Sequence, residues 1–441
     1  MSDIHISEDL LCAHVRDVLP DRQLLDILLN HVAAICPHCR TEVKRFEQGR
    51  KGERGSLHTF LNFALQTVEQ QMEAISEDET RARQDLRVLL KLSADEQVRR
   101  VRRARTRFRS LRLVELLIEE SQASIFEDPL RAGELAMLAT EVIWYDTGAV
   151  RRANELLALA FAYTANAARV RGDFAAAEEY IMAVRSTVRK AGITDSHTLA
   201  EIDHREAALR HMLRALPTAE RLLKRAVLLF TLAGETGGAA QALIALGYLH
   251  SDAGREDQAI SITKIALTLL DECDTRSILC ARHNLTWSLC NLERYEEAET
   301  LFQGSQDLYE QFLDPWTQCR RAWINARIDA GSHREAPAEE RFLKTYEDLC
   351  RNGYPYDAVL LALDLVDLYL RQGRMHAVAE VAEALSVVFA AKGIHREVVS
   401  ALRLFQEKAR QEEVTQRLRI QLGRYLVEAR HQPGLRFRSE S

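Results

Sequence analysis

Three residues near the N-terminus have the side-chain types and the spacing of metal ligands. His31, Cys36 and Cys39 fall within the segment HVAAICPHC. Imidazole and thiolate groups are donors that zinc prefers, and a structural zinc takes four of them in a tetrahedron. Two residues compete as the fourth ligand: His5, which lies 26 residues before His31, and Cys12, which lies 19 residues before it. The pattern predicts a structural zinc site, and a closed site of this kind leaves no position open for catalysis.

The elements that must position these ligands are helices. Residues 21–35 have apolar side chains at helical spacing, and this helix would carry His31 near its C-terminal end. Pro37 suits the first turn of the next helix, so the two cysteines would face back toward His31. The positive end of that helix and a metal would both favour the thiolate form. Two other interpretations stay open: a metal-free helical bundle, and a thiol redox switch of the Cys-x2-Cys kind.

Residues 1–78 resemble the zinc-binding anti-sigma domain family. The resemblance rests on the long interval from His5 to His31 and on the pair Cys36 and Cys39 at a predicted helix junction. One extra residue between His31 and Cys36 departs from the family pattern. The resemblance implies a four-helix module, a zinc held by His5, His31, Cys36 and Cys39, and a sigma factor as the partner.

A run of arginines occupies residues 98–112, with eight arginines between Arg99 and Arg112. An apolar stripe predicts one amphipathic helix through the run. The arginines either form an anion-binding surface for nucleic acid or an acidic partner, or they pair with acidic neighbours at 77–86 and 115–120. The net charge of −6 and the lack of a nucleic-acid-binding motif favour the second interpretation. The stripe consists of Val98, Val101, Phe108 and Leu111.

Most of the remaining chain repeats itself. Six windows share a small residue in one helix, a turn, and an alanine in the next helix, with turns 42, 40, 39, 38 and 42 residues apart. The turn favours glycine, or a polar residue that tolerates a positive φ, and the small residues let two helices approach closely. The sequence therefore predicts an all-α solenoid of helical hairpins. The predicted turn residues are Gly172, Arg214, Gly254, Glu293, Gly331 and Gly373.

These windows resemble tetratricopeptide repeats over residues 113–388, with a period near 40 in place of the usual ~34. The resemblance implies a right-handed solenoid of about seven helix pairs. It also implies that the first helix of each pair lines a concave groove for a protein or peptide. Amide and aromatic side chains there suit peptide backbone and interface anchoring, although they are equally explained as ordinary groove-lining residues. The position predicted to face the partner holds Asn166, Tyr248, Trp287, Asn325 and Asp367.

Four parts of the chain are thus predicted. They are a helical, zinc-binding module at 1–78, a charged helical connector at 79–112 with a break at 93–96, the repeats at 113–388, and capping helices with a tail at 389–441.

Several classes of function lack their signature in this sequence. No phosphate-binding glycine loop, no Gly-x-Ser-x-Gly and no His-Glu-x-x-His occurs, and no stretch of about 18 apolar residues predicts a membrane span. We therefore expect a non-catalytic, cytoplasmic protein that binds a protein or peptide as a regulator, without nucleic-acid or membrane partners. Alternatives are a plain assembly scaffold, a nucleic-acid binder using Arg99–Arg112, and a peptide sensor resembling helical-repeat pheromone receptors, whose N-terminal helix-turn-helix is not evident here.

Overall fold

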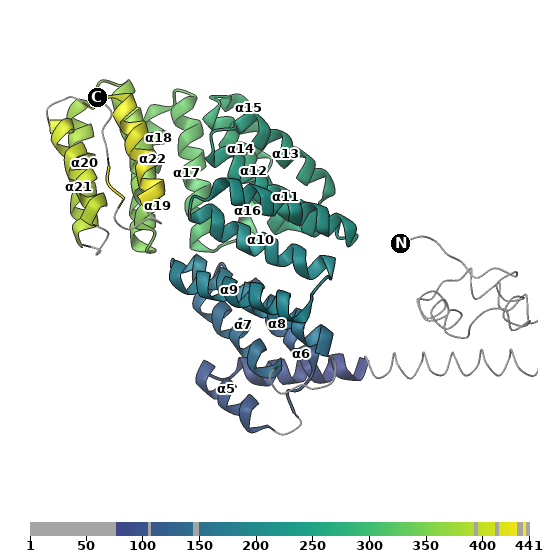
Figure 1. Ribbon diagram of the computed structural model, residues 1–441. Coiled ribbons are helices and arrows are strands. Elements are labelled where there is room, and N and C mark those ends of the chain that lie inside the picture. The colour runs from purple at the N-terminus through teal and green to yellow at the C-terminus, as the bar shows by residue number, and fades with distance from the viewer. Residues whose placement is uncertain are drawn as a thin grey trace, which may run out of the picture. The chain divides into compact units, whose positions relative to one another are not determined.

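All secondary structure in the described part of the chain is helical (Figure 1). The computed structural model describes residues 76–104, 107–143, 150–391, 396–410, 414–429 and 435–437, and no strand occurs among them. The predicted all-α class is confirmed for these residues. Contacts divide the chain into two units that meet between Leu116 and Leu117, and each unit is described by itself. No helix in the described ranges is long and apolar enough to cross a membrane.

The described part of the first unit consists of a helix over residues 76–90, helix α5 (Ala94–Arg103) and the start of α6 (Leu111–Ser124). Ser93 is the N-cap of α5 and forms a capping box with Glu96, so the chain breaks inside the segment predicted to interrupt the connector. Leu89, Val101 and Phe108 are buried and form the core of this unit.

A single helix through residues 98–112 was expected, and this expectation is wrong. Helix α5 ends at Arg103, and Phe108 has a left-handed backbone with φ 63° before α6 begins. The side-chain oxygen of Ser110 accepts from the N–H groups of Arg112 and Leu113, at 3.0 and 3.4 Å, and so caps the start of α6. The apolar stripe therefore belongs to two separate segments that share one core.

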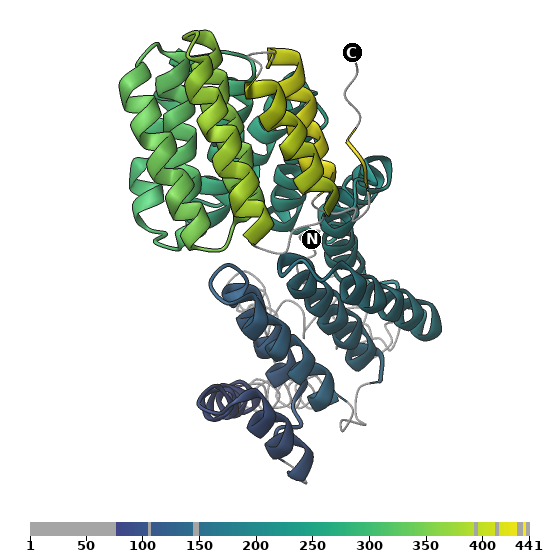
Figure 2. The same ribbon diagram turned by 90° about the vertical axis from the view of Figure 1, so that its left-hand side faces the viewer.

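The second unit is a series of helical hairpins (Figures 1 and 2). It begins within α6 and continues through α7 (Pro129–Ile143). Six further hairpins each consist of a first and a second helix. The first helices are α8 (Val150–Val170), α10 (Ser196–Met212), α12 (Thr236–Asp252), α14 (Thr275–Asn291), α17 (Pro315–Gly331) and α19 (Pro355–Arg371). The second helices are α9 (Phe174–Ala191), α11 (Leu216–Leu232), α13 (Glu256–Leu269), α15 (Tyr295–Gln303) with α16 (Gln306–Glu310), α18 (Glu335–Arg351) and α20 (Met375–Ala391).

The two helices of every hairpin are joined by a three-residue link whose middle residue has a left-handed backbone. In each link the N–H group of the third residue donates to the carbonyl five positions earlier, which is the Schellman arrangement. This bond satisfies a carbonyl that has no partner within the first helix. The middle residues, with φ from 58° to 80°, are Gly172, Arg214, Gly254, Glu293, His333 and Gly373.

Five of the six predicted turn residues are thereby confirmed, and one is corrected. Gly331 is the last residue of α17, and His333 has the left-handed conformation in its place. A Cβ atom on Gly331 would lie 2.1 Å from the ring of Tyr295, so this glycine allows α15 to pack against α17. The prediction mistook a glycine required for close packing for a glycine required by a turn.

A glycine in the middle of α12 has the packing role that the repeat pattern predicts for its small residues. A Cβ atom on Gly247 of α12 would lie 2.4 Å from the hydroxyl oxygen of Thr263 on α13. The two helices of this hairpin therefore approach as closely as they do because position 247 has no side chain.

The C-terminal residues form two more helices, α21 (Arg396–Arg410) and α22 (Gln416–Ala429). Helix α21 packs on α20, whereas α22 returns to pack on α19. Phe405 and Leu422 are buried in the same core cluster as residues of α17 and α19. Both helices lie in the part predicted to cap the repeats, and the four predicted boundaries stay a prediction.

A long-range contact ties the start of the second unit to its middle. The guanidinium group of Arg276 on α14 lies over the ring of Phe126, which follows α6, and over the ring of Phe312, at 4.3 and 4.6 Å from the ring centroids. Arg276 also pairs with Asp314 at 3.0 Å. Because Phe126 and Arg276 are far apart in sequence, this contact limits how far the hairpins between them can move apart.

Candidate functional site

Equivalent positions in the hairpins are found by counting back from the left-handed link residue. The sixth position before the link is half-buried or exposed in every hairpin, while both of its neighbours in sequence are buried. The ninth position lies on the same side of the helix. It is three residues from the sixth position, which places the two side chains only about 60° apart around the helix axis. We call the surface formed by these two positions the first-helix face. The sixth-position residues are Asn166, Ala208, Tyr248, Trp287, Arg327 and Asp367.

Four of the five residues predicted to face a partner have this register: Asn166, Tyr248, Trp287 and Asp367. Asn325 does not, because its position was counted from Gly331, which is not the link residue. Counting from His333 places Arg327 at the sixth position, and Asn325 lies two residues earlier, about 200° around the helix. Whether any of the five predicted residues contacts a partner stays a prediction.

Near the start of the first-helix face, three side chains form a hydrogen-bonded cluster. The hydroxyl of Tyr163 donates to Glu201 at 2.9 Å and accepts from Arg205 at 3.0 Å. Arg205 also pairs with Glu201 at 2.9 Å, and its guanidinium group lies 4.7 Å from the Tyr163 ring centroid. The sequence analysis missed this cluster, although Tyr163 and Arg205 share the ninth position before their links.

Burial dominates the electrostatics of this cluster. It raises the pKa of Tyr163, so the hydroxyl keeps its proton. Burial alone would raise the pKa of Glu201, but the charge of Arg205 outweighs it and holds that pKa below the ordinary value. Burial, with the charge of Arg205, lowers the pKa of the adjacent His204 to about 4. The cluster is thus an ion pair with a neutral tyrosine and a neutral histidine.

The middle of the first-helix face is formed by α12 and is more open. Tyr248 is 44% exposed, and its ring meets the ring of His211 edge-on with centroids 5.1 Å apart. His211 is held by Asp252 at 2.9 Å, and Asp252 also pairs with Arg214. Burial would raise the pKa of Asp252, but its bonds to His211 and Arg214 lower it. These partners fix the surface on which the Tyr248 ring lies.

Trp287 continues the face on α14, and the buried Trp323 of α17 packs against it. The rings of Trp287 and Trp323 meet edge-on with centroids 5.1 Å apart, and the guanidinium group of Arg327 lies 4.3 Å from the Trp287 centroid. The indole N–H of Trp323 donates to Asp364 of α19 at 2.8 Å, and Arg327 lies 3.6 Å from the same carboxylate. Asp364 therefore joins α19 to α17, and Arg327 and Trp323 of α17 continue the contact to Trp287 of α14.

Helix α22 covers the end of this face. Arg419 lies 3.4 Å from Asp367 and 3.9 Å from Asp364, and Gln416 also donates to Asp367. A Cβ atom on Gly423 would lie 3.5 Å from the side chain of Leu363, so the two helices are in close contact. The chain itself thus supplies the partners of Asp367, a residue that the sequence analysis expected to face an external ligand.

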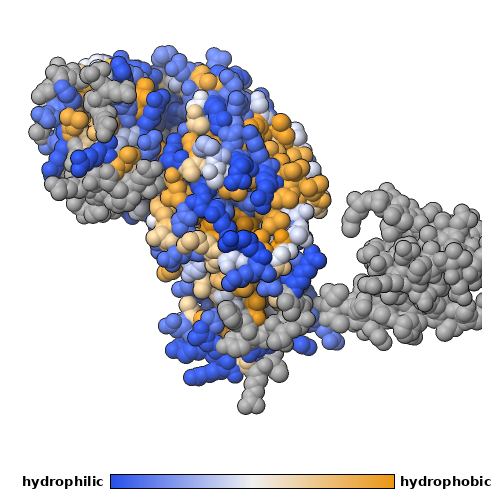
Figure 3. All heavy atoms as spheres, viewed as in Figure 1, coloured by the Kyte–Doolittle hydropathy of each residue, from blue (hydrophilic) through white to orange (hydrophobic). Residues whose placement is uncertain are grey.

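A cavity of about 500 Å³ lies between α9, α10 and α11. Helix α10 packs on α11 and on α8 but touches α9 little, which leaves this space open, and an apolar recess bordered by hydrophilic side chains is visible there (Figure 3). Asp203, in the cavity wall, pairs with Arg225 at 2.7 Å, and burial raises the pKa of its carboxyl to about 6. The apolar part of the lining consists of Val184, Val188, Leu199, Ile202 and Leu222, and further charged residues of the wall are Arg185, Arg189, Glu206 and Arg221.

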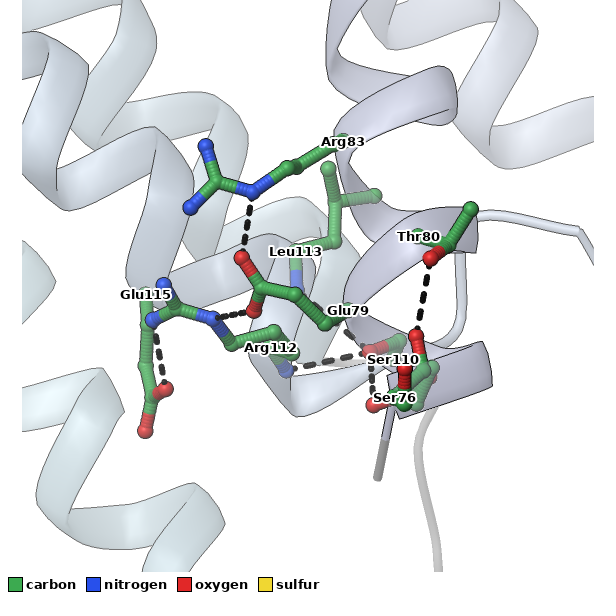
Figure 4. Close-up of polar contacts among 9 residues, drawn as sticks. Ser76, Glu79, Thr80, Arg83, Ser110, Arg112, Leu113 and Glu115 are labelled. Carbon is green, nitrogen blue, oxygen red and sulfur yellow. Dashed lines mark hydrogen bonds and ion pairs between the residues drawn. The ribbon is translucent and has the colours of Figure 1, made fainter. Parts of the chain in front are cut away.

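The arginine run is partly neutralised by acidic neighbours in the first unit. Glu79 lies between Arg83 and Arg112, and Arg112 also pairs with Glu115 at 3.1 Å (Figure 4). Arg107 pairs with the buried Asp85 at 2.6 Å. The interpretation of an acid-paired surface is confirmed for Arg107 and Arg112. A role for the other arginines between Arg99 and Arg112 stays a prediction.

The predicted zinc ligands all lie outside the described residues: His5, Cys12, His31, Cys36 and Cys39. Within the described ranges, no group of three or more His, Cys, Asp and Glu side chains is arranged to hold a metal ion. The sequence pattern also predicts the five cysteines in the repeats to be small buried residues; Cys290 and Cys319 are buried, Cys280 and Cys350 are partly buried, and Cys273 is exposed, which corrects that prediction.

Comparisons with known proteins give little beyond the fold. No protein-family model matches the sequence, and no curated protein matches it. Among solved structures, the chain is similar to the Rap conjugation gene regulator of the plasmid pLS20, solved in complex with the Phr peptide. The identity is 14%, the match covers 72% of this chain and 97% of that chain, and the TM-score is 0.41. A similarity of this degree carries no inference about a partner.

Proposed function

We propose that the second unit is a non-catalytic binding module for a peptide or protein segment, in the manner of the tetratricopeptide repeats that the sequence resembles. The observation that carries the proposal is the exposed ring of Tyr248 at the middle of the first-helix face. Aromatic side chains that are rigid and partly exposed are typical anchors of protein interfaces. Asn284 and Trp287, on the next first helix, are half-buried at the ninth and sixth positions of the same face.

The chemistry of this middle stretch indicates the kind of segment that would bind. Charged groups at both ends of the face are satisfied within the chain, by Glu201 with Arg205 at one end and by Asp364 with Arg419 and Arg327 at the other. Between them, Tyr248, Asn284 and Trp287 are uncharged. An extended peptide would therefore pack apolar side chains on the two rings and give its backbone groups to the amide.

The proposal is tested with peptides selected from a random display library on the full-length chain. Binding of the tightest peptides is then measured by fluorescence polarisation for the wild type, Tyr248→Ala and Trp287→Ala. We expect Tyr248→Ala to weaken binding at least tenfold, since removing a central aromatic anchor costs about 2 kcal/mol or more. Met182→Ala, an exposed apolar residue on a second helix, is the matched control. Equal binding to Tyr248→Ala and to the control would reject this face.

For residues 1–78, the sequence supports the separate proposal of a structural zinc held by His31, Cys36, Cys39 and His5 or Cys12. Elemental mass spectrometry of the full chain after a chelator wash should give about one zinc per chain, lost in Cys36→Ser/Cys39→Ser and kept in Cys273→Ser. A wild type without zinc rejects the site. A zinc-loaded chain that binds none of a panel of purified sigma factors rejects the anti-sigma role while leaving the zinc site intact.

A further inference from the structure

The cavity between α9, α10 and α11 coincides with an irregularity in how successive hairpins pack. At three later junctions the second helix of one hairpin packs broadly on the first helix of the next, as α11 does on α12, α13 on α14 and α18 on α19. Where α9 precedes α10 this packing is nearly absent, and α10 packs on α8 instead. Both α9 and α10 line the cavity of about 500 Å³, so the cavity occupies the place where that contact is missing.

Specific polar contacts hold α10 in this position. On one side, the hydroxyl of Tyr163 on α8 bonds to two residues of α10 in the buried cluster described above. On the other side, Arg210 of α10 donates to Glu178 of α9 at 2.9 Å, and Arg185 of α9 pairs with Glu206 of α10. Long charged side chains thus span the gap between α9 and α10, and the cavity is part of how the two hairpins are joined.

The apolar part of the cavity wall is continuous with the core. Val184, Ile202 and Leu222 are buried, and Val188 and Leu199 are half-buried. Sites for small organic molecules typically have volumes of about 300–1,000 Å³ and a mainly apolar lining with a few polar groups. The size and the lining of this cavity are those of a small-molecule site.

The charged part of the wall carries an excess of positive charge. Each of its two carboxylates has an arginine partner, Arg225 for Asp203 and Arg185 for Glu206. Among the residues that the structure describes, neither Arg189 nor Arg221 forms an ion pair, and Arg189 donates only to the backbone carbonyl of Arg185, at 3.4 Å. The wall therefore contains four arginines against two acidic residues: Arg185, Arg189, Arg221 and Arg225, with Asp203 and Glu206.

The charge of Arg221 acts inside the cavity. Burial raises the pKa of Asp203 to about 6, and the charge of Glu206 adds to this effect, whereas the charges of Arg225 and Arg221 oppose it. Asp203 is a buried residue of the cavity wall. Because Arg221 influences this carboxyl, its guanidinium group is close enough to act on an anion held in the cavity.

We propose that the cavity binds a small organic anion, a carboxylate on a hydrocarbon chain. The chain would lie against Val184, Ile202 and Leu222, where its burial drives binding. The carboxylate would meet the guanidinium group of Arg221, with Arg189 adding to the positive charge, since guanidinium groups form strong charge-assisted hydrogen bonds with carboxylates.

This site is separate from the proposed peptide-binding surface. The positions of α10 that line the cavity lie about 140° around the helix axis from Arg205 and Ala208, which belong to the first-helix face. The proposal therefore goes beyond peptide binding, and each of the two can fail without the other.

The first test is isothermal titration calorimetry of the full-length chain with three probes. Sodium octanoate supplies the chain and the charge, 1-octanol supplies the chain alone, and sodium acetate supplies the charge alone. Octanoate should bind at one site, about tenfold tighter than octanol because of the charge-assisted hydrogen bond, and acetate should not bind measurably. A chain that does not bind octanoate, or that binds octanol as tightly as octanoate, overturns the proposal.

The second test places the site with variants. Arg221→Gln should weaken octanoate binding about tenfold and leave octanol binding unchanged. Leu199→Trp should abolish binding of both, because the larger ring fills the cavity. Lys190→Gln is the matched control, since it removes a positive charge from an exposed position of α9 outside the cavity wall.

Two results of the second test would overturn the proposal. An equal loss in Lys190→Gln and in Arg221→Gln would mean that octanoate responds to the surface charge in general. Octanoate binding retained in a folded Leu199→Trp would place the ligand elsewhere on the chain. Thermal unfolding shows whether Leu199→Trp is folded, and the comparison of Arg221→Gln with Lys190→Gln decides the question if it is not.

Discussion

At α19, the acidic residues of the first-helix face hold partners from α22, whereas at α12 the ring of Tyr248 remains 44% exposed. Both regions belong to the same face and to equivalent positions in the repeat. They differ in that the last hairpins have no further hairpin beyond them, so α21 and α22 must cover what another repeat would have covered. The comparison separates two uses of one position: contacts that hold the chain together and surface available to a partner.

The largest effect is expected where the face is covered. Leu422 of α22 is buried in the core cluster shared with α19, so Leu422→Ala should lower the local unfolding free energy by about 3 kcal/mol. Hydrogen exchange of α19 to α22 should show the loss, while the exchange of α8 to α11 should stay unchanged because repeats feel mainly their neighbours. Ile420→Ala, exposed on the same helix, is the control. Equal effects of the two substitutions would mean that α22 is not packed on α19.

A second large effect is expected at Asp364, which joins α17 to α19. Asp364→Ala leaves the indole N–H of Trp323 without its acceptor and removes the carboxylate that pairs with Arg327, at a cost of about 1–3 kcal/mol. Tryptophan fluorescence during urea unfolding should report it, since Trp323 touches the altered site. Asp348→Ala breaks an exposed pair with Arg351 and should cost about 0.5 kcal/mol or less. A loss at Asp364 no larger than at Asp348 would contradict the bridging role.

The buried cluster of Tyr163, Glu201 and Arg205, with the adjacent His204, should make the stability of the folded chain depend on pH. Burial lowers the pKa of His204 to about 4, so its protonation in the unfolded chain, with an ordinary pKa of about 6.5, removes stability as the pH falls from 6.5 toward 4. The wild type should lose about 2 kcal/mol more between pH 8 and pH 5 than His204→Gln does. Burial raises the pKa of Asp203 to about 6, so this residue stabilises the folded chain at low pH and its effect has the opposite sign. The effect of Asp203 is the same in the wild type and in His204→Gln, and it therefore cancels when the two proteins are compared. Parallel stability profiles would show that His204 is not buried as described.

The sequence was sufficient for those features of the fold that depend on local chemistry. Each hairpin link needs one residue with a positive φ, and Arg214 and Glu293 were recognised there without a glycine. The one error among the link residues, at Gly331, arose because a glycine that contacts Tyr295 lies two residues from the true link residue, His333. Because of that error, Asn325 was predicted to face the partner on α17, whereas Arg327 holds the equivalent position.

Contacts between distant residues could not be predicted in this way. Nothing in the spacing indicates that Arg276 lies between Phe126 and Phe312, or that Arg419 returns to Asp364. These contacts depend on how successive hairpins turn relative to one another, which no local pattern encodes. For this reason the sequence identified candidate positions on the first helices but not which of them the chain itself occupies.

The smallest effect on stability is expected at the uncovered position. Tyr248→Ala should change the unfolding free energy by about 0.5 kcal/mol or less, as for most exposed positions, because the His211 ring beneath it stays held by Asp252. Trp287→Ala, by contrast, removes the ring that Trp323 and Arg327 contact and should cost about 3 kcal/mol. Thermal unfolding of the two variants side by side measures the difference. If Tyr248→Ala lowers the unfolding free energy as much as Trp287→Ala does, the Tyr248 side chain contributes to stability in the way that the α19 residues covered by α22 do. The first-helix face would then offer no surface for a partner at α12.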